Sequence, residues 1–87
     1  MTATPEFIVH AKSSGCSFCD KAKALLDKHR RVYTVKTYDS IEDLRRAVAP
    51  YIPASRVQSF PLILDAESGE VIGGYNHILE RLEEPIL

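Results

Sequence analysis

The sequence has 87 residues, of which 45% are hydrophobic and 26% are charged, with 11 basic and 12 acidic residues and a net charge of -1. This length predicts a single domain over residues 1–87 and leaves no room for two, and the composition excludes a disordered chain. The near-neutral charge provides no general field for nucleic acid or an anionic membrane, so we expect neither among the partners.

The N-terminal segment, residues 1–7, lacks both the basic residues and the long apolar run of a secretion signal. No stretch of the sequence approaches the roughly 18 apolar residues that a membrane helix needs. We therefore expect the protein to remain in the reducing cytoplasm, where a purely structural disulfide is unusual.

The first part of the chain alternates strands with helices. A short apolar run over Glu6–Ala11 predicts a buried strand. After a turn at residues 13–15, apolar residues recur at helical spacing over Ser17–His29, with positive charge near the helix end. The alternating, β-branched stretch Val32–Lys36 predicts a second strand.

A second helix is predicted to begin after Ser40, which is a favourable N-cap residue, with Asp43 in the capping-box position. Its expected apolar face has four residues at helical spacing: Ile41, Leu44, Val48 and Tyr51. Pro50 and Pro53 limit the length of this helix.

The last part of the chain predicts a hairpin and a third helix. Strands over Pro61–Asp65 and Glu70–Ile72 flank a turn at residues 68–69. Asn76 is expected to cap the last helix, which should end at Pro85. The order β-α-β-α-β-β-α predicts an α/β fold in which three helices flank a four-stranded mixed sheet.

The only two cysteines, Cys16 and Cys19, lie three residues apart at the predicted start of the first helix. This spacing places both on nearly one helix face, close enough to form a disulfide. At the helix N-terminus, unpaired N–H groups and the helix dipole should lower the pKa of Cys16 below the free value of about 8.5. Cys19 should be less exposed, so one thiol can attack and the other can resolve the mixed disulfide.

Three other interpretations of the pair remain: packing residues, half of a zinc site, or a structural disulfide. A pair that opens a helix after a strand is the context of redox motifs. A zinc site needs further ligands, and His10, His29 and His77 do not have zinc-finger spacing, so we predict no metal. The expected compartment argues against a structural disulfide, and we therefore predict redox chemistry.

Two further motifs are candidates for ligand binding. The Phe60-Pro61 step precedes a buried strand, and a cis bond there would leave the Phe60 backbone free to pair with an extended peptide. An ordinary strand-entry proline is the alternative. The N–H groups around Gly73–Asn76 could hold a carboxylate, or the segment could be only a turn and a cap.

Taken together, these features resemble those of glutaredoxins over nearly the whole chain. The matching features are Lys12 before the active-site turn, the cysteine pair, the stretch DKAKALL over residues 20–26, Ser59-Phe60-Pro61, and Gly73-Gly74 before the last helix. The resemblance is closest to the small glutaredoxins of bacteriophages and bacteria.

The resemblance implies a thioredoxin fold with a cis peptide bond at Pro61, with Cys16 as nucleophile and Cys19 as resolving thiol. It implies a glutathione-binding groove formed by Lys12, Phe18, Gln58, Phe60, Pro61, Gly74, Tyr75 and Asn76. Lys12, with Arg56 or Gln58, would meet the glycine carboxylate, and N–H groups near Asn76 would meet the γ-glutamyl carboxylate. The implied clients are glutathione mixed disulfides and protein disulfides such as that of ribonucleotide reductase.

The sequence departs from the usual family pattern at several positions. Ser17 and Phe18 replace the usual Pro and Tyr, Asn76 replaces Asp, and Lys12 lies four residues before Cys16 instead of three. Some glutaredoxins with this serine hold a [2Fe–2S] cluster between two subunits, so cluster binding is one alternative. A thioredoxin-like donor reduced by a reductase protein and a redox-inert interaction domain are two others. We expect a monomer that uses glutathione as co-substrate.

Overall fold

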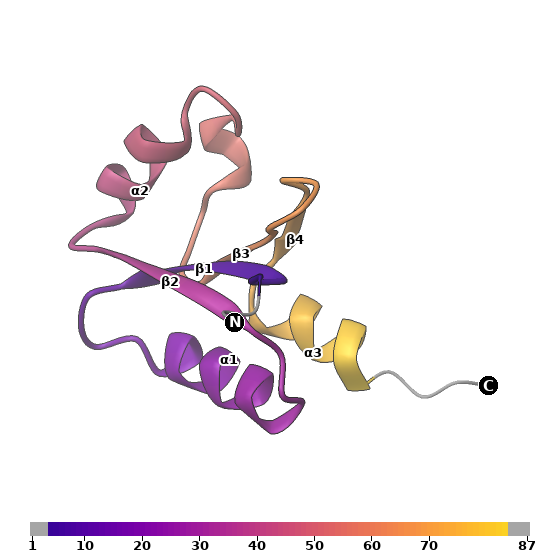
Figure 1. The fold of residues 1–87 in the computed structure, drawn as a ribbon. Helices are drawn as coiled ribbons and strands as arrows, with labels where there is room; N and C mark the ends of the chain where they lie inside the picture. The colour runs from indigo at the N-terminus through magenta and orange to yellow at the C-terminus, as the bar shows by residue number, and fades with distance from the viewer. Residues whose placement is uncertain (1–3, 84–87) are drawn as a thin grey trace.

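The computed structural model describes residues 4–83, which form a four-stranded mixed sheet with helices on both faces (Figure 1). The strand order is β2-β1-β3-β4; β1 and β2 are parallel, whereas β3 is antiparallel to both β1 and β4. The elements are β1 (Phe7–Lys12), α1 (Ser17–Lys28), β2 (Tyr33–Tyr38), α2 (Ile41–Val48), a short 3-10 turn (Ala54–Arg56), β3 (Leu62–Asp65), β4 (Val71–Gly73) and α3 (Tyr75–Glu83). The predicted α/β fold with a mixed sheet and three helices is confirmed, and it is consistent with a thioredoxin-like fold.

The two faces of the sheet bury separate cores, because successive side chains of a strand point to opposite faces. Helices α1 and α3 cover one face and α2 covers the other (Figure 1). The core under α1 and α3 comprises Phe7, Val9, Ala11, Cys19, Ala22, Leu25, Leu26, Ile63 and Ile78. The core under α2 comprises Leu44, Val48, Ile52, Val57, Leu62 and Leu64. Cys19 is therefore part of a packed core, which fixes the start of α1 against the sheet.

The turn between β1 and α1 brings the cysteine pair to the C-terminal end of the two parallel strands. Gly15 adopts a φ of 68°, a conformation that glycine reaches without steric cost. The backbone N–H of Ser13 donates to the Tyr38 carbonyl at 2.8 Å, and its hydroxyl donates to Asp39 at 2.9 Å. These bonds attach the turn to the end of β2.

The second strand ends later than the sequence predicts. It spans Tyr33–Tyr38 instead of Val32–Lys36, because β1 provides parallel partners along its whole length, from Phe7 with Tyr33 to Lys12 with Tyr38. Strand β1 starts and ends one residue later than the predicted Glu6–Ala11, and β3 starts one residue later than predicted and ends at Asp65 as predicted.

The predicted helix α2 is correct at its start and wrong at its end. The Ser40 hydroxyl accepts a hydrogen bond from the Asp43 N–H at 3.2 Å, which confirms the N-cap. The helix ends at Val48, and Tyr51 is 85% exposed instead of part of its apolar face. Pro50 lacks the N–H that would continue the helix, and the following turn brings Ile52 into the core instead.

The hairpin from β3 to β4 is confirmed, with the Asp65 N–H donating to the Glu70 carbonyl at 2.9 Å. Strand β4 is shifted by one residue from the predicted Glu70–Ile72. Helix α3 begins at Tyr75, so Asn76 lies in its first turn and the prediction that it caps the helix is wrong. The first helical bond runs from the Ile78 N–H to the Gly74 carbonyl at 3.2 Å, which makes Gly74 the capping position. The predicted end at Pro85 lies outside the described residues.

Candidate redox site

Cys16 is the N-cap residue of α1, with extended backbone angles of φ -119° and ψ 96°. Its Sγ accepts a hydrogen bond from the Cys19 N–H at 3.1 Å. A side chain at this position normally satisfies one of the unpaired N–H groups of the first turn, and here a sulfur atom does so. The helix start therefore directs a hydrogen-bond donor and its positive dipole end at the Cys16 sulfur.

Cys16 and Cys19 form a disulfide, and their Cα atoms lie 5.3 Å apart. Cys16 is half-buried, whereas Cys19 is 1% exposed within the core under α1 and α3. The two sulfurs therefore differ in access, as expected: an incoming disulfide can reach Cys16 but not Cys19. This difference is what a thiol–disulfide exchange pair needs, because one sulfur must meet the substrate and the other must stay in reserve.

Aromatic side chains flank the pair on the side of α3. The ring of Phe18 is 51% exposed, and its centre lies 6.0 Å from that of Tyr75. The Lys21 ammonium lies over the Phe18 ring at 5.1 Å from its centre, a cation–π contact. The contact between the Phe18 and Tyr75 rings connects the starts of α1 and α3 and forms an aromatic wall on the Cys16 side of both helices.

The segment before β3, which contains Phe60 and Pro61, also lies at the site. The Phe60-Pro61 peptide bond is cis, as the resemblance implied. Phe60 is half-buried and packs against both cores, while Pro61 is buried. A Cβ atom at Gly74 would lie 3.5 Å from the Pro61 carbonyl oxygen, so the segment lies directly against the start of α3.

A cavity of about 320 Å³ opens between this segment and the start of α3. Its lining includes three of the predicted glutathione-binding residues, Gln58, Pro61 and Gly74, together with Arg56 and His77. Gln58 donates a side-chain hydrogen bond to the Ser55 carbonyl at 3.0 Å, which holds the turn on the other side of the cavity. The structure thus brings these residues together in one hollow.

Five of the predicted glutathione-binding residues do not line this cavity: Phe18, Phe60 and Tyr75, which are described above, and Lys12 and Asn76. Lys12 is exposed at the end of β1, paired in register with Tyr38. Asn76 is exposed in the first turn of α3. Both lie at the same end of the molecule as Cys16, and their contribution to glutathione binding stays a prediction.

A partly buried polar pair, His10 and Tyr38, lies next to Phe60. His10 is 5% exposed, and its Nδ1 forms a hydrogen bond with the Tyr38 hydroxyl at 2.9 Å. Burial, with a smaller effect of the Lys36 charge, lowers the pKa of His10, and burial raises the pKa of Tyr38. The Tyr38 ring stacks near Phe60 at 6.5 Å between centres. Tyr38 and Phe60 both pack against the core under α2, so the His10–Tyr38 pair lies against the Phe60 segment on that face of the sheet.

Sequence reasoning gave no role to His77, which the structure places at the site. Its Nδ1 accepts a hydrogen bond from the Gly74 N–H at 3.3 Å. In a capping box, the third helical residue reaches back to the N-cap N–H, usually through Glu or Gln. The spacing of three residues after Gly74 was the signal that could have identified His77, once the helix start was known.

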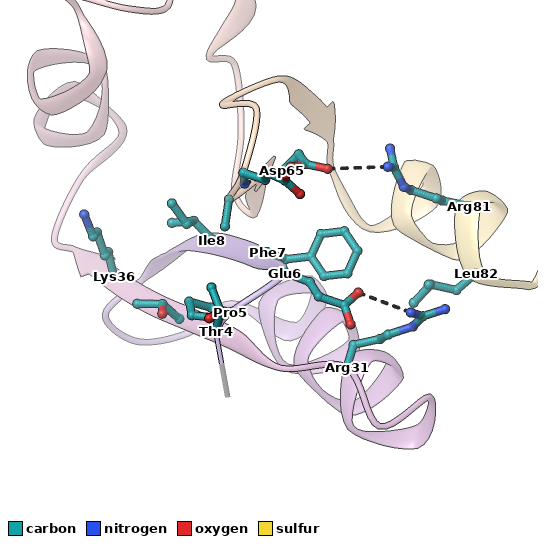
Figure 2. Close-up of a pocket in the computed structure, with 13 residues that line it drawn as sticks. Thr4, Pro5, Glu6, Phe7, Ile8, Arg31, Lys36, Asp65, Arg81 and Leu82 are labelled. Carbon is teal, nitrogen blue, oxygen red and sulfur yellow. Dashed lines mark hydrogen bonds and ion pairs between the residues drawn. The ribbon is translucent and has the colours of Figure 1, made fainter. Parts of the chain in front are cut away.

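A larger cavity, of about 1170 Å³, lies at the other end of β1 (Figure 2). Figure 2 shows two ion pairs across it, Glu6 with Arg31 and Asp65 with Arg81. None of the predicted site residues lines it. Its size alone does not make it a functional site, because its charged side chains are mostly paired with one another.

The described residues contain neither a cluster of three or more metal-ligating side chains nor a helix long and apolar enough to cross a membrane. A scan against protein-family models, a search of curated proteins and a search of solved structures each found no match. The fold and the site together define a small α/β protein with a cysteine pair of the thiol–disulfide exchange type.

Proposed function

We propose that this protein is a glutathione-dependent thiol–disulfide oxidoreductase that reduces glutathione mixed disulfides and protein disulfides. The observation that carries the proposal is the Cys16 sulfur at the N-cap of α1, which accepts the Cys19 N–H at 3.1 Å. The same bond would stabilise a Cys16 thiolate in the reduced protein, and the thiolate is the reactive form of cysteine.

With a glutathione mixed disulfide, the Cys16 thiolate attacks the glutathione sulfur. A bond forms between Cys16 and glutathione, and the client leaves as a thiolate that takes a proton from water. The thiolate of a second glutathione then attacks the bound glutathione sulfur, which releases oxidised glutathione and restores the Cys16 thiolate. The net reaction converts one glutathione and the mixed disulfide into the client thiol and oxidised glutathione.

With a protein disulfide, Cys16 attacks one client sulfur and Cys19 completes the reaction. Cys19 loses its proton and attacks the Cys16 sulfur, which releases the client dithiol and forms the Cys16–Cys19 disulfide. Two glutathione molecules then reduce this disulfide. Ribonucleotide reductase is a candidate client on the resemblance to glutaredoxins alone.

Four features of the site support glutathione as the reductant. Phe18 and Tyr75 form an aromatic wall next to Cys16, and the 320 Å³ cavity opens between the segment before β3 and the start of α3. Among residues 4–83, neither backbone group of Phe60 has a hydrogen-bond partner, so both can pair with an extended tripeptide. Arg56 is the one side chain of fixed charge in the described lining of the cavity, and its positive charge suits a carboxylate.

The test is glutathione-dependent reduction of a small mixed disulfide by the wild type, Cys16→Ser and Cys19→Ser. We expect Cys16→Ser to lose activity by at least about a thousandfold, because the nucleophile is removed. Cys19→Ser should keep this activity and lose the reduction of protein disulfides.

A wild type that glutathione cannot reduce would contradict the proposal. Rapid reduction by a thioredoxin reductase would then favour a thioredoxin-like donor. A brown protein on anaerobic purification would point to a [2Fe–2S] cluster held by Cys16 thiolates and glutathione. Equal activity of the wild type and Cys16→Ser would show that the pair is not the reactive group.

A further inference from the structure

An arginine of α2 holds the segment that precedes β3. The Nε of Arg45 donates a hydrogen bond to the Val57 carbonyl at 2.7 Å. Val57 is 0% exposed in the core under α2, and within residues 4–83 no backbone N–H donates to its carbonyl. This carbonyl therefore depends on Arg45 for its hydrogen bond, because a buried polar group without a partner is costly.

Val57 lies between two residues that face the cavity. Arg56 and Gln58 are exposed and line the 320 Å³ cavity, whereas Val57 packs into the core and is absent from the lining. The Val57 carbonyl and the Gln58 N–H belong to one planar peptide unit, which turns as a whole. The direction of this carbonyl therefore also sets the direction in which the chain leaves toward Gln58 and Phe60.

The other hydrogen bonds of this turn stay within it. The Val57 N–H donates to the Ala54 carbonyl at 3.0 Å, and the Gln58 side chain donates to the Ser55 carbonyl at 3.0 Å. Within the part of the chain that the structure describes, the bond from Arg45 is the one hydrogen bond that joins residues 54–58 to another element. Arg45 thus ties the turn to α2.

The next residue of α2 provides a comparison. The Arg46 side chain is 77% exposed and forms an ion pair with Asp43 at 3.2 Å. Arg45 is half-buried, and among residues 4–83 it forms no ion pair. Two adjacent arginines of one helix therefore differ in a single respect that concerns the site, which is the bond to Val57.

We propose that Arg45 is a positioning residue for glutathione binding, which acts through the Val57 carbonyl. This inference rests on the proposed function. The bond keeps Arg56 and Gln58 directed toward the cavity, and it keeps the Phe60 backbone aligned for an extended tripeptide. Without the donor, the carbonyl must turn toward water, and the peptide plane turns with it.

The reactivity of the thiolate should not depend on this bond. Helix α2 covers the face of the sheet opposite to α1, which carries Cys16 at its start (Figure 1). Loss of the bond should therefore weaken the binding of the glutathione part of a substrate and leave the attack by Cys16 unchanged.

The experiment compares Arg45→Met, Arg45→Gln and Arg46→Met in the reduction of a glutathionylated peptide at saturating glutathione. Methionine has a methyl carbon where arginine has Nε, so it removes the donor. Glutamine has its amide nitrogen at that position, so it keeps the donor without the charge. We expect Arg45→Met to raise the KM for the peptide about tenfold and to change kcat by less than about twofold. Arg45→Gln and the control Arg46→Met should keep a KM close to that of the wild type.

A small disulfide without glutathione tests whether the effect is confined to binding. In the reduced protein, the Cys16 thiolate attacks one sulfur of dithiodipyridine, forms a mixed disulfide with it and releases pyridinethione, whose absorbance gives the rate. All three variants should release the first pyridinethione at the wild-type rate, because this disulfide has no tripeptide for the segment before β3 to bind.

Several outcomes would overturn the role of Arg45. These are an unchanged KM in Arg45→Met, a KM raised equally in Arg45→Gln, and slower release of pyridinethione in Arg45→Met. If Arg45→Met does not fold, Arg45→Lys replaces it: its ammonium lies one bond beyond the Nε position, so its KM should exceed that of Arg45→Gln, and equal values would overturn the inference. A wild type that reacts with dithiodipyridine but does not reduce the glutathionylated peptide contradicts the proposed function as well.

Discussion

The two ends of strand β1 differ in how the surrounding elements are held together. At its first residues, ion pairs connect separate elements (Figure 2). These pairs are Glu6 with Arg31, Asp65 with Arg81, and Glu83 with both Lys28 and His29. At its last residues, around Cys16, no ion pair joins two elements within residues 4–83. Apolar packing, aromatic contacts and capping hydrogen bonds hold that end.

This difference separates the charges that stabilise the fold from the groups that react. At the far end, Lys28, Arg31 and Arg81 each pair with a carboxylate. Near Cys16, the Lys21 ammonium lies over the Phe18 ring, and the start of α1 adds the positive end of its dipole. The positive end of the α1 dipole favours a thiolate at Cys16.

The largest of the remaining effects should come from Phe18. Because its ring is half-exposed, Phe18→Ala should change the free energy of unfolding by no more than about 0.5 kcal/mol. It removes the aromatic wall next to Cys16, so we expect the KM for glutathione to rise about fivefold in the mixed-disulfide assay. Tyr51→Ala is the matched control, since Tyr51 is also an exposed ring but belongs to the turn after α2. Equal KM values for the two variants would place the binding surface elsewhere.

Much of the fold could be predicted from the sequence because its signals are local. The helical spacing after Cys19 and the cap at Ser40 need only neighbouring residues to be recognised. The end of α2 was missed because the turn at Pro50 changes which residue points inward, and only the packed structure shows that Ile52 takes the place expected for Tyr51.

The candidate site could be predicted only in part. The cysteine pair is visible in the sequence because both residues belong to one helical turn. The cavity is not, because the residues that line it, such as Gln58 and Gly74, are separated along the chain and are brought together only by the fold. The role of His77 was hidden by the expectation that Asn76 caps the helix, which moved the helix start by two residues.

A smaller effect should distinguish the two helix caps at the Cys16 end. Ser40 and Cys16 accept the N–H of the third helical residue at 3.2 and 3.1 Å, respectively. Ser40→Ala should lower the free energy of unfolding by about 1 kcal/mol, since it leaves that N–H without its cap. In urea unfolding under reducing conditions, Cys16→Ser should keep the stability of the wild type, because serine is a good N-cap.

Together, Ser40→Ala and Cys16→Ser should show that the Ser40 cap contributes to stability and that the Cys16 cap contributes to the chemistry. Ser40→Ala should retain activity, whereas Cys16→Ser should lose it. A large loss of stability in Cys16→Ser would show that the sulfur also contributes packing that an oxygen atom cannot replace.

The smallest effect should come from the far end, at Glu83. Its carboxylate accepts hydrogen bonds from Lys28 at 2.7 Å and from His29 at 2.9 Å. The Lys28 bond, followed by that of His29, lowers the pKa of Glu83. A carboxyl whose pKa is lower in the folded protein stabilises it above the unfolded pKa, and this stabilisation is lost as the pH falls through the folded value.

Glu83→Gln should therefore be slightly less stable than the wild type from pH 7 down to about pH 5, and the difference should shrink on further acidification. The effect should be small because the three side chains are partly exposed to solvent. Urea unfolding at pH 7, 5 and 3 measures it, and the mixed-disulfide assay at pH 7 should give wild-type activity. A stability difference unchanged at pH 3 would assign the effect to packing, and a loss of activity would show that the two ends of β1 are coupled.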